Sequence, residues 1–259
     1  MRIDLYLVEK GFCESRNKAS RLIGEGKILL DGKTVNKPSF DVDDGEHTVE
    51  ITENDKYVGR GGLKLEAALA AFQIDVSGKK CIDVGASTGG FTDCLLQNGA
   101  AFVCAVDSGR GQLHEKLLAD LRVTSVEGFN ARQLSSEDFG FFDVAVMDVS
   151  FISQTLLHQA VASVLNDGAV FVSLIKPQFE AGKSALGKGG IVKKASDRAE
   201  AVLRVLESAS LCGFHTAGVI RSPIEGGDGN REYLAMFVKS GSQDATLGKN
   251  IDVKQLCKD

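Results

Sequence analysis

The stretch Cys81-Ile82-Asp83-Val84-Gly85-Ala86-Ser87-Thr88-Gly89-Gly90-Phe91-Thr92-Asp93 decides how this chain folds. A short apolar run is followed by a turn rich in glycine, and an apolar pattern that predicts a helix begins after Gly90. This order of strand, glycine-rich turn and helix start is the place where an open α/β sheet binds a nucleotide-like ligand. Glycine would let the backbone approach that ligand closely, because it has no Cβ.

Strand-like and helix-like segments alternate after this stretch. Strands are predicted at residues 81–84, 102–106, 124–126, 144–147 and 169–175, a helix at 196–211, and two late strands at 216–221 and 232–238. Such alternation predicts an α/β fold with a mostly parallel, doubly wound sheet. A late pair of strands is typical of the Rossmann-like fold of S-adenosylmethionine-dependent methyltransferases.

The first part of the chain has a different pattern, which predicts a small α+β domain. Helices are expected at residues 2–10 and 16–23, the second capped by Ser15. The pair Asp31-Gly32 between two apolar runs predicts a hairpin with a primed turn, and residues 48–51 predict a closing strand. The predicted organisation is a domain at 1–52, a polar linker at 53–62, the α/β domain at 63–240 and a polar tail at 241–259.

The composition is that of an ordinary soluble protein. The 259 residues are 43% hydrophobic and 25% charged, with a formal net charge of −5. No signal segment begins the sequence, and no uncharged apolar run approaches the ~18 residues of a membrane span. We therefore expect a cytoplasmic protein without membrane contact. The six cysteines show no CxxC spacing and no Cys/His cluster, which argues against a metal site.

The glycine-rich turn departs from the dinucleotide pattern GxGxxG, because Ser87 stands at the position of the second glycine. The next predicted strand ends at Asp107, whose carboxylate could accept hydrogen bonds from a ribose diol. This pattern favours S-adenosylmethionine over NAD, with Asp83 and backbone donors of the turn holding its amino-acid end and Asn130 beside its adenine. The predicted cofactor-binding residues are Asp83, Gly85, Ala86, Ser87, Thr88, Gly89, Gly90, Phe91, Asp107 and Asn130.

Three polar residues stand where predicted strands end or begin. Asp148 and Lys176 follow apolar runs, and Glu232 begins the last predicted strand. Ligands of open α/β sheets bind beyond the carboxyl ends of the parallel strands, where Asp148 and Lys176 are expected. An antiparallel last strand would bring Glu232 to the same edge. Each alone is more often a solvated loop charge, but together they indicate a functional site.

Basic residues gather near the N-terminus although the whole chain is acidic. Residues 16–37 carry six Lys or Arg against two acidic residues. The runs 2–4, 15–19, 21–23, 26–28 and 31–38 resemble the RNA-binding domain shared by ribosomal small-subunit protein four and pseudouridine synthases. The resemblance implies contacts with structured RNA, and the alternative is a set of solvated lysines. The candidate RNA contacts are Arg2, Arg16, Lys18, Arg21, Lys27, Lys33, Lys37 and Arg60.

A closer resemblance covers nearly the whole chain and rests on five runs. They are Tyr57-Val58-Gly59-Arg60-Gly61-Gly62-Leu63-Lys64-Leu65, residues 83–93, Met147-Asp148-Val149-Ser150-Phe151-Ile152-Ser153, Leu174-Ile175-Lys176-Pro177-Gln178-Phe179-Glu180 and Gly229-Asn230-Arg231-Glu232-Tyr233. The chain is similar to the TlyA family of ribosomal RNA methyltransferases, whose second domain resembles FtsJ (RrmJ) ribose methyltransferases. Some relatives carry a haemolysin name, which a sequence without a signal peptide or spanning segment does not support.

The family resemblance implies an S-adenosylmethionine-dependent 2′-O-methylation of cytidine in small- or large-subunit ribosomal RNA. It also implies a catalytic tetrad formed by Lys64, Asp148, Lys176 and Glu232. We expect a monomer that binds ribosomal RNA or ribosomal subunits and needs no metal.

The chemistry gives each member of the tetrad a role. A ribose hydroxyl must lose its proton to become a good nucleophile, and a partly buried lysine near a second lysine can accept it. We assign the base to Lys176 and the orientation of the ribose to Lys64, with Asp148 and Glu232 holding the amines. The alternatives are a non-catalytic RNA-binding ribosome-assembly factor, a dehydrogenase and a secreted cytolysin.

Overall fold

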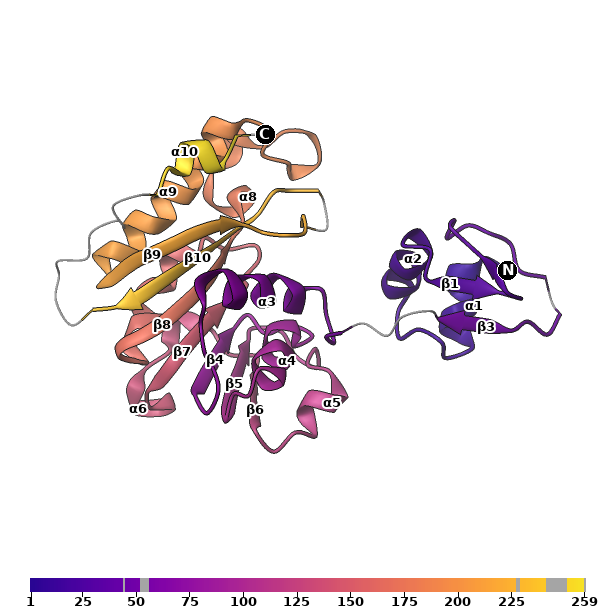
Figure 1. Cartoon of the computed structure of the whole chain (residues 1–259), viewed down its shortest axis with the longest axis horizontal. Coiled ribbons are helices and arrows are strands. Elements are labelled where there is room, and N and C mark those ends of the chain that lie inside the picture. The colour runs from indigo at the N-terminus through magenta and orange to yellow at the C-terminus, as the bar shows by residue number, and fades with distance from the viewer. Residues whose placement is uncertain (44, 52–55, 227–228, 241–250, 259) are drawn as a thin grey trace. The chain divides into compact units, whose positions relative to one another are not determined.

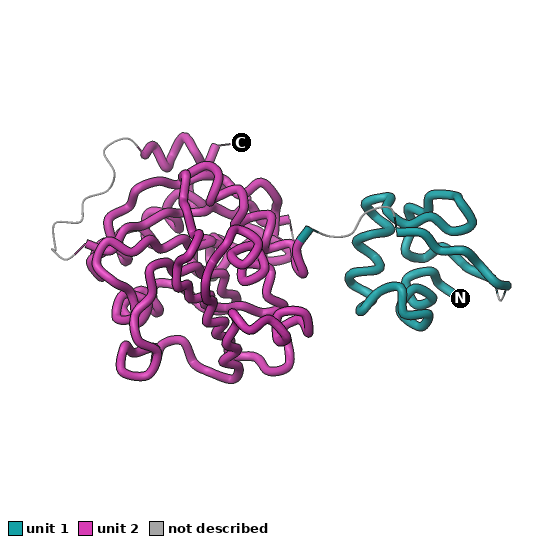
Figure 2. The backbone as a smooth tube through the Cα atoms, turned by 60° about the horizontal axis from the view of Figure 1, so that its bottom comes forward, with its two compact units in different colours: residues 1–56 teal, residues 57–259 magenta. Residues whose placement is uncertain are grey.

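The computed structural model describes residues 1–43, 45–51, 56–226, 229–240 and 251–258. The chain divides into two compact units, residues 1–56 and residues 57–259 (Figure 2). Each unit has its own hydrophobic core, and each is described by itself.

Unit 1 packs two helices against a small antiparallel sheet. The helices are α1 (Ile3–Glu9) and α2 (Arg16–Gly24), and the sheet has the order β2 (Lys33–Thr34), β1 (Ile28–Leu30) and β3 (Val49–Ile51) (Figure 1). Its core includes Ile3, Leu7, Ile23 and Ile28, all fully buried. The predicted α+β arrangement of this part of the chain is therefore observed.

Local sequence signals explain how these elements begin and turn. The Ser15 side chain caps α2 by accepting a hydrogen bond from the Lys18 N–H at 3.3 Å. Asp31 and Gly32 connect β1 to β2 with φ values of +51° and +73°. Positive φ at both central residues is the mark of a primed hairpin turn, which matches the twist of the strands.

A histidine joins this hairpin turn to the loop before β3. The His47 ring contacts Asp31 Oδ2 through Nδ1 at 2.7 Å and Asp43 Oδ1 through Nε2 at 2.8 Å. The hydrogen bond with Asp31, and then that with Asp43, raises the pKa of His47 above its ordinary value. The His47 ring lowers the pKa of Asp31, while the Gly45 N–H, followed by His47, lowers the pKa of Asp43.

This histidine cluster should make the stability of unit 1 depend on pH. Folding raises the pKa of His47, so its stabilisation is complete below about pH 6.5 and is lost as the pH rises through the folded pKa. Folding lowers the pKa of both carboxyls, so their stabilisation is present above about pH 4 and lost in acid. Urea unfolding of the full chain, followed by the amide NMR signals of β1 and β3, should show a lower midpoint at about pH 8.5 than at about pH 6.

A His47→Gln variant is the control, since it should remove this difference between the two midpoints. An unchanged midpoint in the wild-type chain would contradict the role of the cluster.

Unit 2 is built on a seven-stranded sheet. The strands in spatial order are β6 (Val123–Glu127), β5 (Phe102–Asp107), β4 (Lys80–Val84), β7 (Phe142–Met147), β8 (Leu165–Ile175), β10 (Tyr233–Lys239) and β9 (Phe214–Arg221). Neighbours are parallel except that β10 runs antiparallel to both β8 and β9. The predicted α/β fold with a doubly wound sheet and a late hairpin is confirmed.

Helices cover both faces of this sheet (Figure 1). One core cluster joins a sheet face to α3 (Gly61–Phe72), α4 (Gly90–Gln97) and α5 (Glu115–Leu118). The other face packs against α7 (His158–Ser163), α9 (Ala195–Leu211) and α10 (Val253–Leu256). Adjacent residues of β4 illustrate the alternation, because Cys81 belongs to the first cluster and Ile82 to the second.

Short elements complete the described part of unit 2. They are α6 (Ser136–Phe139), α8 (Pro177–Glu180) and the 3₁₀ turns at Ala131–Gln133, Gln154–Leu156, Lys183–Ala185 and Lys188–Gly190. Within the predicted polar tail, Val253 and Cys257 are buried, and Arg198 Nη2 donates to the Cys257 carbonyl oxygen at 2.8 Å. No helix in the described ranges is long and apolar enough to cross a membrane.

Candidate active site

The turn between β4 and α4 depends on glycine because the protein packs tightly around it. A Cβ on Gly85, which has a φ of +86°, would lie 2.5 Å from the Asp148 carbonyl oxygen. A Cβ on Gly89, with a φ of +95°, would collide with the Leu117 side chain. Gly85 and Gly89 therefore also let neighbouring parts of unit 2 pack closely against the turn, a role that the sequence did not indicate.

Residues 57–62 lie against this turn as part of unit 2. A Cβ on Gly90 would stand 3.0 Å from both the Gly59 carbonyl oxygen and the Gly62 nitrogen. A Cβ on Gly62 would collide with the ring of Tyr57, which is only 3% exposed. The second half of the predicted linker is thus packed against the turn, and its residues 53–55 lie outside the described residues.

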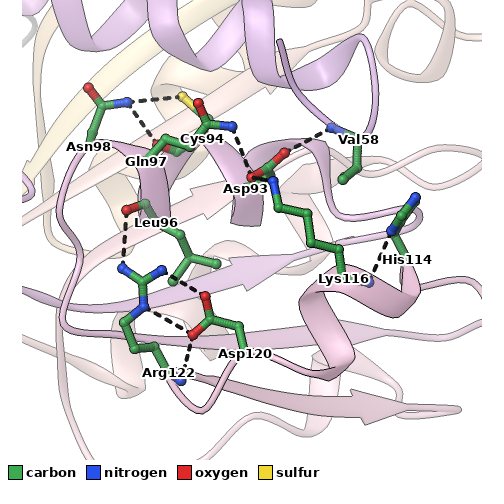
Figure 3. A network of polar contacts seen from close by, with 10 residues as sticks. All are labelled: Val58, Asp93, Cys94, Leu96, Gln97, Asn98, His114, Lys116, Asp120 and Arg122. Carbon is green, nitrogen blue, oxygen red and sulfur yellow. Dashed lines mark hydrogen bonds and ion pairs between the residues drawn. The ribbon is translucent and has the colours of Figure 1, made fainter. Parts of the chain in front are cut away.

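Asp93, in the first turn of α4, contacts two other segments of the chain (Figure 3). Its carboxylate accepts a hydrogen bond from the Val58 N–H at 2.9 Å and pairs with Lys116 Nζ at 3.3 Å. Arg122 donates to the Leu96 carbonyl oxygen at 3.3 Å and so joins the end of α4 to the start of β6. Because Asp93 is buried, the Val58 N–H and the Lys116 ammonium compensate for the loss of water around its charge.

A cavity of about 460 Å³ opens at the carboxyl ends of β4, β5 and β7. It is lined by Gly85, Ser87, Asp107 and Asn130 of the predicted cofactor residues, together with Phe129. The Asp107 carboxylate accepts hydrogen bonds from the N–H groups of Ser87 at 2.8 Å and Gly109 at 2.7 Å. These bonds fix an acceptor at the cavity wall, among apolar groups typical of small-molecule sites.

A smaller cavity of about 210 Å³ joins the turn to the ends of β7 and β8. It is lined by Ala86, Thr88, Gly90 and Phe91, and it shares Gly85 and Ser87 with the larger cavity. Asp148 and Lys176 complete its lining. The two cavities therefore meet beside Asp148, which lines both of them, whereas Lys64 and Glu232 line neither.

Asp83 and Gly89 line neither cavity, although both were predicted to bind the cofactor. Asp83 is fully buried, and its Oδ2 accepts a hydrogen bond from Thr92 Oγ1 at 2.7 Å. Its Oδ1 has no hydrogen-bond partner among the residues that the structure describes. Burial raises the pKa of this carboxyl to about 7, because the interior disfavours its charged form.

Lys176 and Asp148 form the first of two ion pairs among the four predicted catalytic residues. They follow the parallel strands β8 and β7, which brings both to the same edge of the sheet. Lys176 Nζ lies 2.6 Å from Asp148 Oδ1 and donates to Ser150 Oγ at 2.8 Å. The sequence did not identify Ser150 as a site residue. Only its position two residues after Asp148 could have indicated it.

Lys64 and Glu232 form the second pair. Lys64 Nζ lies 2.5 Å from Glu232 Oε2, and the side chains are 10% and 2% exposed. Tyr233, at the start of β10, pairs with Ile175 at the end of β8. This register brings Glu232 to the sheet edge where Lys176 lies. Across the described ranges, no group of three or more His, Cys, Asp or Glu could hold a metal ion.

The predicted RNA contacts fall into different settings. Arg2 Nε and Arg16 Nη2 each lie 2.9 Å from the buried carboxylate of Asp4. Arg60 belongs to unit 2, where its Nη2 donates to the Glu225 carbonyl oxygen at 3.2 Å. Of the remaining predicted contacts, Lys18 pairs with Glu14. Arg21 and Lys27 both pair with Glu25. Lys33 and Lys37 line a cavity of unit 1.

Comparisons with known proteins agree with this architecture. The FtsJ-like methyltransferase family matches residues 57–239, and the S4 domain matches residues 1–47. Hemolysin A of Brachyspira hyodysenteriae is 43% identical over 92% of this chain and 100% of its own length. The 16S/23S rRNA (cytidine-2'-O)-methyltransferase TlyA of Mycobacterium tuberculosis is 42% identical over 97% of this chain and 94% of its own.

A solved structure of a hemolysin-named protein from Streptococcus thermophilus is 42% identical and has a TM-score of 0.80. It matches 99% of this chain and 94% of its own. The family resemblance seen in the sequence is confirmed by these matches along almost the whole length. The chain belongs to the FtsJ-like methyltransferase family, among the relatives of TlyA, and in it an S4 domain precedes the methyltransferase domain.

Proposed function

We propose that this protein transfers a methyl group from S-adenosylmethionine to the 2′-hydroxyl of cytidine in ribosomal RNA. The observation that carries the proposal is the Lys176–Asp148 pair at the wall where the two cavities meet. The name of the Mycobacterium tuberculosis relative, a 16S/23S rRNA (cytidine-2'-O)-methyltransferase, supports the same substrate class.

The larger cavity fits the methyl donor in size and chemistry. Its volume of about 460 Å³ lies in the range of small-molecule sites. Asp107 would accept hydrogen bonds from the ribose diol, and Phe129 with Asn130 would border the adenine. N–H groups of the turn would suit the carboxylate of its amino-acid end, whereas Asp83 is buried and lines neither cavity. When bound, S-adenosylmethionine supplies an electrophilic methyl group on its sulfonium.

The smaller cavity would hold the ribose that receives the methyl group. Lys176 Nζ, in its neutral form, would accept the proton that the 2′-hydroxyl loses when its oxygen takes the methyl group. Asp148 and Ser150 hold Nζ in place. Lys64, fixed by Glu232, orients the ribose so that its oxygen approaches in line.

Unit 1 would supply affinity for the RNA through its basic side chains. Arg2 and Arg16 share the Asp4 carboxylate, yet their side chains remain 47% and 54% exposed. Asp4 therefore holds two guanidinium groups side by side with free edges directed at solvent. Arginine side chains held in this way can bind phosphate oxygens with little loss of conformational entropy.

Replacing Asp4 by asparagine should weaken the binding of ribosomal RNA although the variant gains positive charge. Each arginine freed from Asp4 would have to be ordered on binding, at about 0.5–1.5 kcal/mol per side chain, which corresponds to about tenfold weaker binding in total. The measurement is the dissociation constant of the full chain for unmodified ribosomal RNA at fixed salt. Glu9→Gln, which makes the same charge change at an exposed site of α1, is the control and should bind slightly better than wild type.

The reaction is tested with methyl-labelled S-adenosylmethionine and ribosomal RNA transcribed without modifications. Label should appear in 2′-O-methylcytidine, and the next phosphodiester should resist alkali. A chain that binds this RNA without transferring label would be a non-catalytic assembly factor instead.

A further inference from the structure

Unit 1 contains a cavity of about 540 Å³ that the proposed reaction does not use. We call it the hairpin cavity, because the β1–β2 hairpin lines it together with His47 and residues between 36 and 43. Its floor is apolar and consists of Leu30, Val35 and Val42, each at most 7% exposed. A cavity of this size with an apolar floor can accept a flat organic group.

Phe40 offers an aromatic face at this cavity. Its side chain is 46% exposed, although its backbone is held firmly. The carbonyl oxygen of Phe40 accepts a hydrogen bond from the Ile3 N–H at 2.8 Å, and its N–H donates to the Lys37 carbonyl oxygen at 2.9 Å. A ring carried on a fixed backbone loses little entropy when another ring stacks on it.

The hairpin cavity is lined by charges of both signs. Lys33 and Lys37 are exposed on β2 and the loop that follows it. The acidic lining residues are Asp31, Asp41 and Asp43, and His47 binds the carboxylates of Asp31 and Asp43. A phosphate group would therefore lie against Lys33 and Lys37, with an attached base over the apolar floor.

We propose that the hairpin cavity binds one unpaired nucleotide of the RNA substrate, with its base stacked on Phe40 and its phosphate against Lys33 and Lys37. A stacking ring beside cationic side chains is the combination that proteins use to hold single-stranded nucleic acid. The inference rests on the proposed function, since it takes RNA as the substrate. It gives unit 1 a contact with a base in addition to its contacts with phosphates.

The test compares RNA binding by matched phenylalanine variants of the full chain. Phe12 is the control because it is 40% exposed in the same unit and lies outside the lining of the hairpin cavity. Stacking on one aromatic ring is worth about 1–3 kcal/mol, so Phe40→Ala and Phe40→Leu should weaken binding of unmodified ribosomal RNA about tenfold. Phe40→Tyr should retain affinity, and Phe12→Ala should stay within about twofold of wild type.

Salt dependence separates the stacking contact from the charged ones. Phe40→Leu should leave the slope of log affinity against log salt unchanged, because the ring displaces no counterions. Lys37→Ala should reduce that slope by about one. Phe40→Leu keeps an apolar side chain, so it decides the question if Phe40→Ala proves unstable.

Equal affinities of the Phe40→Leu and Phe12→Ala variants would overturn the inference. This result can be distinguished from a failure of the proposed function, because RNA binding and methyl transfer are measured separately. If Phe40→Leu weakens RNA binding but the wild-type chain transfers no methyl group, the proposed reaction is refuted and the inference about the hairpin cavity stands. If the wild-type chain transfers the methyl group and Phe40→Leu does not weaken RNA binding, the inference is refuted and the proposed reaction stands.

Discussion

Replacing Lys176 by alanine should reduce the rate of methyl transfer by about 10²–10⁴-fold, the usual contribution of a positioned general base. The loss should appear in the single-turnover rate at saturating donor and RNA, because Lys176 Nζ is the group we assign to accept the 2′-hydroxyl proton. Affinity for S-adenosylmethionine should change little, because the larger cavity does not include Lys176.

Two further variants make this prediction specific. Lys176→Arg places a permanent cation, which cannot accept a proton, beside Asp148, so it should be about as inactive as Lys176→Ala. Lys79→Ala removes an exposed lysine just before β4, at the opposite end of that strand from the site, and should keep wild-type activity. A Lys176→Ala rate within about tenfold of wild type would remove Lys176 from the role of base.

Replacing Glu232 by leucine should lower the free energy of unfolding of unit 2 by about 3–5 kcal/mol, because it leaves the Lys64 ammonium buried without its partner. Lys64 is 10% exposed and Glu232 is 2% exposed, so water cannot replace the lost carboxylate without a change in packing. Urea unfolding of the full chain, followed by a signal from the unit 2 sheet, measures the loss. Methyl transfer should fall as well, since Lys64 would no longer be held.

The double variant Lys64→Met, Glu232→Leu separates stability from catalysis. Replacing a whole buried ion pair by apolar side chains of similar volume is often neutral or stabilising, so the double variant should recover most of the lost stability. It should stay inactive, because the ribose-orienting amine is gone. A double variant as unstable as the single one would place the cause in packing rather than in the unpaired charge.

The positions of the strands of unit 2 along the sequence could be predicted because buried parallel strands are nearly continuous apolar runs. Strand β8 shows the limit of this rule. It begins at Leu165, whereas the apolar run predicted a start at residue 169. The intervening Asn166, Asp167 and Gly168 are exposed and look like a turn in sequence, but Leu165 pairs with Phe142 of β7. Pairing with a distant strand, rather than local preference, extends this element.

The residues of the candidate site could be predicted from the sequence more readily than the contacts between them. The carboxyl ends of β7 and β8 are adjacent in any sheet of this order, so Asp148 and Lys176 could be expected to meet. The hydrogen bond from Lys176 to Ser150 depends on the path of a loop, which no periodicity describes. Likewise, Gly90 in the sequence indicates a turn. Its close approach to Gly59 could not be predicted, because it depends on how residues 57–62 fold back.

The contact between Gly59 and Gly90 bears on how the protein can be cut into fragments. Regular structure in unit 2 begins with α3 at Gly61, which invites a fragment that starts at that helix. Such a fragment would lack the Val58 N–H that Asp93 accepts and the Tyr57 ring that lies over Gly62. The smallest fragment that preserves the donor site therefore starts ahead of Tyr57, and an irregular stretch of chain is as much a part of that fragment as its strands.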